Sequence, residues 1–259
     1  MSMRTYMRVA SMVALVAVWW IGSLFTLPEV LPSPFRIVMT MGRILVELGP
    51  EGHSAYFHIG ITLFRIIIAF VVAMLAGIGI GLAMGLRKTV EYSLMSLIPL
   101  FLTIPTILMV FLAVLWFGFS ETGSLVAVMA VVTPFVTVNM AEGTKAMDKS
   151  LMDMAKSFKA NPRMMIRKVY IPQLMPYLMS AFRYSFGMTW KIVALAETFG
   201  IKFGIGYMFF FWFENFDMEQ VLAWVLLFVI LMLIIEYGVI ARFEQRAFAW
   251  RRTFSAAAL

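Results

Sequence analysis

The sequence predicts an all-α membrane protein with six transmembrane helices, and three observations lead to that fold class. Hydrophobic residues make up 62% of the 259 residues, whereas soluble domains are roughly half apolar. The mean hydropathy is +0.91. The apolar residues also fall in runs of about 20, the length that an α-helix needs to cross a bilayer. The length suits one bundle of such helices, so residues 1–259 are predicted to form a single transmembrane domain.

The predicted spans are apolar runs bounded by charged residues or proline. The first run follows Arg4 and Arg8, and we interpret it as a retained helix rather than a signal peptide because no small-residue cleavage site follows it. After it, Ser33-Pro34 predicts the start of a shorter amphipathic helix at the membrane surface. The six spans cover residues 9–27, 66–86, 94–117, 125–140, 177–199 and 221–240.

Basic residues predict the orientation of these spans. Lys and Arg concentrate in alternate connections, and membrane proteins carry this excess on the cytoplasmic side. Both termini and the long loop 141–172 are therefore predicted to be cytoplasmic. The cytoplasmic set is Arg4, Arg8, Arg87, Lys88, Lys145, Lys149, Lys156, Lys159, Arg163, Arg167, Lys168, Arg242, Arg246, Arg251 and Arg252. The outer set is Arg36, Arg43, Arg65 and Lys202.

Composition excludes several kinds of site. The chain has no cysteine, which excludes disulfides, thiol nucleophiles and cysteine metal ligands. His53 and His58 lack a matched acidic cluster, so we expect ordinary structural roles, with a metal pair as the alternative. No phosphate-binding GxxxxGK[ST] motif occurs, so energy for transport would come from a partner or an ion gradient. The net charge of +7 is attributed to loops that face anionic lipid, and no nucleic-acid partner is expected.

Glycines and prolines inside the spans predict local features of packing. Gly77, Gly81 and Gly85 lie four residues apart on one helix face, a spacing that lets two helices approach closely. Prolines in the third and fourth spans indicate either broken helices that line a cavity or simple kinks in a static bundle. These prolines are Pro99, Pro105 and Pro134.

Charged residues inside the fifth span are candidates for a solute pathway. Arg183 and Lys191 lie about two turns apart on one face, and Glu197 lies on another. Charges at membrane depth usually face a bundle interior or a watery cavity. Alternatively, Arg183 snorkels to the cytoplasmic end and Glu197 is wet at the outer end, which leaves Lys191 as the deep charge. The candidate pathway residues are Pro105, Arg183, Trp190, Lys191 and Glu197.

The loop 141–172 contains a predicted amphipathic helix. Its apolar positions at helical spacing are Leu151, Met154, Ala155 and Phe158. Lys156 and Lys159 lie on the other side, and Asn161-Pro162 is expected to end the helix and start another. Such a helix either docks into a groove on a partner protein or lies on the inner leaflet.

This loop resembles the "EAA" loop of membrane subunits in binding-protein-dependent ABC importers. The family pattern is E-A-A, three residues, Gly, nine residues and I-x-L-P. Asp153-Met154-Ala155 falls on E-A-A, Lys159 falls on the Gly, and 169–172 falls on I-x-L-P without a gap. The departures are Asp for Glu, Met for Ala and Lys for Gly. The stretch "IPLFLTIPTILMVFLAVLWFG" and its neighbours are similar to the branch that imports taurine, alkanesulfonates, nitrate and related small anions.

The resemblance implies a type I ABC importer permease subunit in the bacterial cytoplasmic (inner) membrane. Its expected partners are a cytoplasmic ATPase, a periplasmic or lipid-anchored solute-binding protein and a second permease copy in a homodimer. ATP and Mg would be bound by the ATPase, so no cofactor is expected here. The short helix in loop 141–172 would be the coupling helix. The implied coupling residues are Leu151, Asp153, Met154, Ala155, Phe158, Lys159, Ala160 and Pro172.

Two other functions are weighed against this one. A gradient-driven secondary transporter would use Lys191 and Glu197, but such folds are often built from internal repeats, and no repeat between the halves is evident. An intramembrane enzyme would need a nucleophile–base or metal constellation. His53 and His58, in a chain without cysteine, supply neither.

Overall fold

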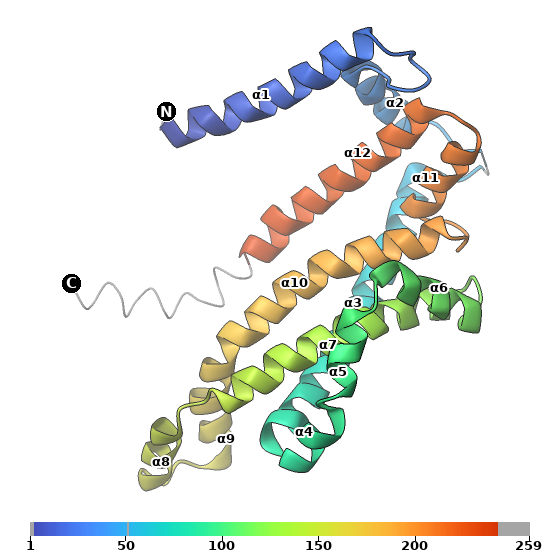
Figure 1. Cartoon of the computed structure of the whole chain (residues 1–259). Helices are drawn as coiled ribbons and strands as arrows, with labels where there is room; N and C mark the ends of the chain where they lie inside the picture. The colour runs from blue at the N-terminus through green and yellow to red at the C-terminus, as the bar shows by residue number, and fades with distance from the viewer. Residues whose placement is uncertain (1–2, 51, 243–259) are drawn as a thin grey trace. The chain divides into compact units, whose positions relative to one another are not determined.

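The computed structural model describes residues 3–50 and 52–242, and every regular element within them is helical (Figure 1). The predicted basic residues Arg246, Arg251 and Arg252 lie outside the described residues. The elements are α1 (Met3–Leu24), α2 (Pro34–Val46), α3 (Ala55–Leu86), α4 (Lys88–Leu94), α5 (Leu97–Thr103), α6 (Thr106–Phe117), α7 (Glu121–Lys145), α8 (Lys149–Ser157), α9 (Pro162–Met164), η1 (Met165–Tyr170), α10 (Ile171–Thr198), α11 (Ile205–Glu214), α12 (Met218–Ile235) and η2 (Glu236–Ile240).

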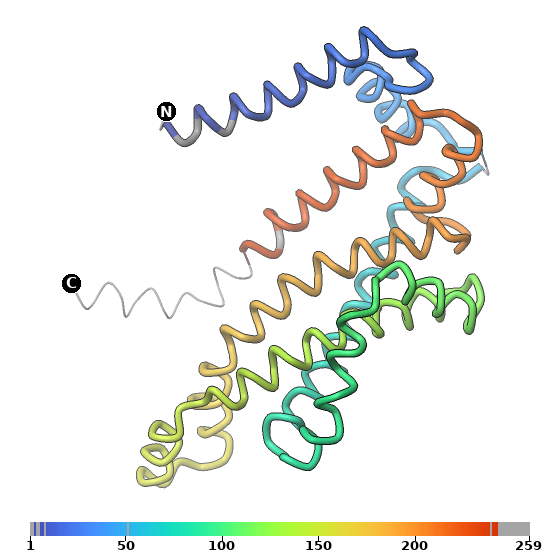
Figure 2. The backbone as a smooth tube through the Cα atoms, viewed as in Figure 1, coloured from blue at the N-terminus to red at the C-terminus, as the bar shows by residue number. Residues whose placement is uncertain are grey.

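The chain divides into two compact units, and each combines segments that are distant in sequence. The first unit contains Met1–Thr62 and Glu197–Ile234. The second contains Leu63–Ala196 and Ile235–Leu259. In Figure 2 the first unit is recognised by the blue N-terminal tube and the orange-red tube of α11 and α12.

The first unit buries one face of α2 against the first turns of α3 and against α11 and α12. Ile37 and Ile44 of α2 are buried in one apolar cluster with Trp224 of α12 and Met208 of α11. Pro34 occupies the first turn of α2, where its missing N–H leaves no helical bond unmade. The amphipathic helix predicted after Ser33 is therefore confirmed.

The second unit is held together by close contact between α3 and α7. A Cβ atom added to Gly81 would lie 2.6 Å from both the Met140 Cβ atom and the Thr137 carbonyl oxygen. Gly77 and Gly85 face α7 in the same way. Only the lack of a side chain at these positions lets the two backbones pack this closely. The predicted packing role of this glycine stripe is confirmed.

Among the described residues, three helical segments are long and apolar enough to cross a membrane alone: α3, α7 and Met218–Gly238. A fourth candidate is the pair α5 and α6, which is bent by 103°. The apolar part of α1, Val9–Leu24, is shorter. The helix α10 has 28 residues and includes Arg183, Lys191 and Glu197. Helix α3 begins at Ala55 instead of residue 66, so it extends beyond the predicted second span.

The third predicted span, residues 94–117, is not one helix. Ile104 has extended φ and ψ angles of −69° and 127°, and Pro105 follows it as the N-cap of α6. Proline lacks an N–H group and disfavours a helical conformation in the residue before it, which explains the break. In contrast, Pro134 lies inside α7 without interrupting it. The two prolines thus have different structural consequences.

Candidate functional site

The segment α8 to η1 corresponds to the predicted amphipathic loop, and its first helix starts at a capped residue. The Asp148 side chain accepts a hydrogen bond of 2.8 Å from the Ser150 N–H. Hydrogen bonds from the Ser150 side chain and backbone lower the pKa of the exposed Asp148 carboxyl. The carboxylate form is the one that accepts these bonds, and it also favours the positive end of the helix. The Asp148 N–H donates to the Gln173 side chain at 2.7 Å, which ties this cap to α10.

The end of α8 shows how Lys159 fits at the position that the resemblance assigns to glycine. The Ala160 N–H donates to the Ala155 carbonyl at 3.0 Å, and the Lys159 N–H donates to the Lys156 carbonyl at 2.8 Å. These two bonds define a Schellman turn, in which the residue after the C-cap adopts a left-handed conformation. Lys159 is that residue, with φ of 51°. A glycine would fit there without steric cost, so the turn is kept although the residue differs.

The helix ends earlier than predicted. Ser157 is the last residue of α8 and Phe158 is its C-cap. Asn161 instead caps the next helix, because its side chain accepts a 2.8 Å hydrogen bond from the Met164 N–H. The predicted boundary at Asn161-Pro162 therefore marks the start of α9 correctly but places the end of α8 too late.

The apolar positions of α8 are exposed. Leu151 is 41% exposed, Met154 is 53% exposed and Phe158 is 81% exposed. The polar side carries an ion pair of 3.1 Å between Asp153 and Lys156. Ala155, Ala160 and Pro172 are half-buried. Side chains of this size usually pack against other apolar groups, so the exposed face of α8 has the chemistry of a docking surface.

The charged residues predicted for a pathway have different environments. The Arg183 Nε atom lies 3.3 Å from a Glu236 carboxylate oxygen, so this cation is paired within the second unit. Lys191 is exposed. Trp190 is fully buried, and its ring meets the Phe186 ring edge-on at 6.0 Å. Of these residues, Lys191 alone combines charge with an exposed side chain that has no ion pair within the described residues.

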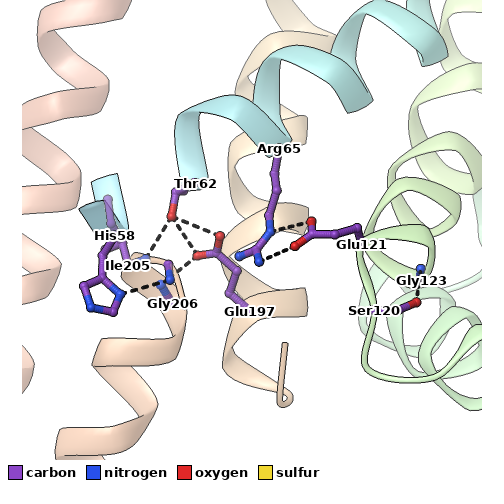
Figure 3. A network of polar contacts seen from close by, with 10 residues as sticks. His58, Thr62, Arg65, Ser120, Glu121, Gly123, Glu197, Ile205 and Gly206 are labelled. Carbon is purple, nitrogen blue, oxygen red and sulfur yellow. Dashed lines mark hydrogen bonds and ion pairs between the residues drawn. The ribbon is translucent and has the colours of Figure 1, made fainter. Parts of the chain in front are cut away.

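Glu197 is fully buried in the first unit, at the N-terminus of α11 (Figure 3). Each of its carboxylate oxygens lies 3.0 Å from the Thr62 hydroxyl. The Gly206 N–H donates a further hydrogen bond of 2.9 Å. One alternative placed this carboxylate in water at the outer end of the span. The structure instead gives it the position that a bound anion takes at a helix N-terminus.

The neighbouring N–H groups of α11 are also satisfied by side chains. The Ile205 N–H donates to the Thr62 hydroxyl at 2.8 Å, and the Gly204 N–H donates to His58 Nδ1 at 3.1 Å. The Glu197 cluster is defined as His58, Thr62, Glu197 and the backbone of 204–206. His58 therefore has a structural role as an acceptor. Among the described residues no group of three or more His, Asp or Glu side chains could hold a metal ion.

An ion pair that the sequence did not predict lies in the second unit. The Arg65 guanidinium donates to both carboxylate oxygens of Glu121, at 2.7 and 2.6 Å (Figure 3). Glu121 is in the first turn of α7, which is capped by the Ser120 side chain through a 3.2 Å bond from the Gly123 N–H. Arg65 was expected only as a polar residue before the second span. No short-range pattern connects it to Glu121, which is 56 residues away.

A cavity of about 110 Å³ lies in the second unit at the break between α5 and α6. Broken helices that line a cavity were one of the two interpretations of the span prolines, and the break at Pro105 fits that interpretation. None of the described lining residues is charged, so Arg183, Lys191 and Glu197 are not among them. Its polar lining residues were not predicted from the sequence. These are Thr106, Tyr184 and Ser185.

Comparison with known proteins identifies the family. Residues 73–248 match the family described as binding-protein-dependent transport system inner membrane component. The chain belongs to this family. Members of the family are membrane components of transport systems by that description, so the chain is a multi-pass membrane transport protein and not an enzyme.

Curated relatives agree with the expected branch of the family. The chain is 27% identical to the taurine transport system permease protein TauC of Escherichia coli, over 96% of this chain and 91% of the relative. It is 25% identical to the aliphatic sulfonates transport permease protein SsuC of Bacillus subtilis, for which that role is described as putative, over 93% of this chain and 86% of the relative.

A solved structure agrees with the fold. The chain resembles one chain of the MetNI methionine ABC transporter in its inward-facing conformations, with a TM-score of 0.59 and 16% identity. The match covers 74% of this chain and 97% of the other. The expected all-α permease fold is thereby confirmed at the level of the fold.

Proposed function

We propose that this chain is the membrane-spanning subunit of an ATP-driven importer for a small anionic solute of the sulfonate or taurine type. Membership of the binding-protein-dependent transport family supports the importer assignment. The relatives named for taurine and aliphatic sulfonates support the class of solute. The exposed apolar face of α8 is the main observation that supports coupling to a separate ATPase.

The proposed topology has six spans in one permease domain of the inner membrane, with both termini in the cytoplasm. The broken pair α5–α6 serves as the third span. The remaining spans are α1, α3, α7, α10 and α12 with its continuation. The excess of Lys and Arg in alternate connections supports this orientation.

In the proposed mechanism, α8 is the coupling helix. Its apolar residues Leu151, Met154 and Phe158 enter a groove of a cytoplasmic ATPase, which binds ATP and Mg. Two permease copies form a homodimer, and closure of the two ATPases moves the bundles between inward-open and outward-open states. A solute-binding protein delivers the solute from outside. The capped start of α8 and the Schellman turn at its end support a rigid helix that can transmit this motion.

The proposed solute path is lined by α5, α6, α7 and α10 of each copy. Pro105 contributes by breaking the third span beside the cavity. Lys191 is the charged candidate that remains available, because its side chain is exposed. Arg183 is paired with Glu236, and both Trp190 and Glu197 are buried. We therefore assign these last three residues supporting positions rather than direct contact with solute.

Co-purification tests the coupling role. Phe158→Glu places a charge on the apolar face of α8, and we expect the ATPase to be lost from the purified complex, with affinity reduced about tenfold or more. Lys156→Glu places the same side chain on the polar face and serves as the matched control, which should retain the ATPase. Retention of the ATPase and of solute uptake by Phe158→Glu would contradict the proposal. So would uptake by this chain in vesicles that lack any ATPase.

A further inference from the structure

The break between α5 and α6 leaves backbone groups beside a cavity. Helix α6 begins at Thr106 after Pro105, and no side chain caps it. The first N–H groups of a helix have no acceptor in a preceding turn, and they carry the positive end of the helix dipole. In α6 the Leu108 and Met109 N–H groups donate to the Pro105 carbonyl, so the N–H groups open to a ligand are the first two, of Thr106 and Ile107. Thr106 and Ile104 both line the cavity of about 110 Å³. Unsatisfied backbone at membrane depth is tolerated where it lines a polar cavity.

A buried hydroxyl group that α10 contributes to the lining has no partner among the described residues. Ser185 of α10 lines the same cavity and is 1% exposed. Its Oγ atom forms no hydrogen bond with any described residue. One turn later in α10, the Thr189 hydroxyl donates a 2.8 Å hydrogen bond to the backbone carbonyl oxygen of Ser185, four residues back. Ser185 makes no such bond, and a buried hydroxyl without a partner is destabilising unless a ligand or water completes it.

The remaining wall of the cavity is largely apolar and uncharged, and it includes an aromatic pair. The rings of Phe135 and Tyr184 are stacked with their centroids 3.9 Å apart. Both residues line the cavity, and no described lining residue carries a carboxylate or an ammonium group. The lining therefore offers neutral hydrogen-bond donors at the α6 end and an apolar surface beside them.

We propose that this cavity is a solute site that receives a single oxyanion group, such as a sulfonate. The Ser185 hydroxyl and the first N–H groups of α6 would donate to its oxygens, and the Phe135–Tyr184 pair would contact its short apolar part. The inference rests on the proposed function and deepens it. A volume of about 110 Å³ is well below that of sites for drug-sized ligands, so the group has only a few heavy atoms.

Neutral donors suit a site that must release its ligand. An anion held by a buried Lys or Arg forms strong charge-assisted bonds and leaves slowly. Hydroxyl and backbone N–H groups bind the same oxygens without a countercharge. The site would therefore select for an oxyanion while keeping the residence time short, as a transport path requires.

Single-cysteine labelling tests the proposal, because the natural chain has no cysteine. Ser185→Cys in the full chain, in lipid nanodiscs, is treated with a sulfonate-bearing methanethiosulfonate reagent and with its trimethylammonium counterpart. Rates are normalised to those of free cysteine. We expect the normalised anion-to-cation ratio to be about tenfold or more, which corresponds to one hydrogen bond to a charged group. Ethanesulfonate should slow the labelling, whereas choline should not.

Two further variants make the result decisive. Thr189→Cys is the matched control, since Thr189 is fully buried, is already bonded and is not a lining residue of the cavity, so it should react with neither reagent. If Ser185→Cys fails to fold, we expect the same preference for the anionic reagent at Thr106→Cys, because Thr106 also lines the cavity. A ratio near one, faster labelling by the cation, or no labelling of either cavity position would overturn the proposal.

The labelling experiment needs no ATPase. Its outcome is therefore separate from that of the Phe158→Glu test. If Phe158→Glu releases the ATPase but the cavity shows no preference for the anionic reagent, the coupling role is supported and the oxyanion site is contradicted. If the ATPase never associates with the chain but the preference for the anionic reagent is found, the oxyanion site is supported and the coupling role is contradicted.

Discussion

The N-termini of α11 and α6 make an instructive comparison, because both begin beside buried polar groups. At α11, the Glu197 carboxylate and the Thr62 and His58 side chains accept from the three backbone N–H groups of 204–206. At α6, no side chain caps the helix, and the Ser185 hydroxyl across the cavity has no partner among the described residues. The first helix end is closed by an internal anion and the second is open.

This difference separates two uses of the same physical feature. A helix N-terminus attracts negative charge, whether the charge belongs to the protein or to a ligand. Where the protein supplies the carboxylate, as at Glu197, the site stabilises the fold. Where the protein supplies only donors, as at Thr106 and Ser185, the proposed ligand is an external oxyanion. The comparison predicts stability effects at α11 and transport effects at α6.

The largest expected effect is on the stability of the Glu197 cluster. Gly204 has φ of +117°, which L side chains rarely adopt, and an added Cβ atom would overlap the Glu197 carboxylate. We expect Gly204→Ala to lower the free energy of unfolding by about 3 kcal/mol or more, from backbone strain together with displacement of the carboxylate. Thermal unfolding of the wild-type chain and the variant in detergent would measure this loss of stability.

Gly187→Ala is the matched control for this substitution. A Cβ atom at Gly187, inside α10, would meet no atom within 4 Å. Alanine is about 1 kcal/mol better than glycine in a helix interior, so the control should be neutral or slightly stabilising. Equal thermal stability of Gly204→Ala and Gly187→Ala would remove the distinction between the closed helix end and an ordinary position inside a helix.

A smaller stability effect, but a clear transport effect, is expected at Ser185. Ser185→Ala removes a buried hydroxyl that has no partner, so the free energy of unfolding should change by less than about 1 kcal/mol, or rise. Uptake of the solute should fall about tenfold, because one donor to the anion is lost. Thr189→Val removes a hydroxyl that is already bonded, and it should lower stability by about 1 kcal/mol without changing uptake. Unchanged uptake by Ser185→Ala together with reduced uptake by Thr189→Val would contradict the prediction.

The smallest expected effect is at the exposed turn after α8. Lys159 also has a positive φ, of 51°, where glycine is favoured, but its side chain is exposed. We expect Lys159→Gly to stabilise the Schellman turn by about 0.5–1 kcal/mol. Amide hydrogen exchange in α8 should slow by a few-fold. Lys156→Gly, inside α8, should instead speed it, since glycine costs about 1 kcal/mol in a helix interior.

Features that depend on short-range patterns were predictable from the sequence. The glycine stripe of α3, the proline start of α2 and the amphipathic helix α8 all follow from spacings within one helix. The break at Pro105 belongs to this group, although the same reasoning could not tell it from Pro134, which α7 accommodates. Whether a proline breaks a helix depends on neighbours that satisfy the freed carbonyl groups, and these neighbours are tertiary.

Partners of buried polar groups were not predictable. Thr62 and Glu197 are 135 residues apart, and Arg65 and Glu121 are 56 apart. Arg183, Lys191 and Glu197 lie in one predicted span and were all candidates for a solute path, yet one is paired, one is exposed without an ion pair among the described residues, and one is buried in a cap. Ser185 was overlooked because an isolated serine in an apolar helix has no distinguishing pattern.

The sequence by itself determined the membrane class, the expected family and the position of the amphipathic helix α8, because each follows from hydropathy, charge or residue spacing along the chain. The tertiary structure alone decided which polar groups are satisfied inside the protein and which, such as the Ser185 hydroxyl, have no partner among the described residues. The physical reason is that a hydrogen bond depends on the distance between two groups in space, and residues such as Thr62 and Glu197 meet only after the chain has folded.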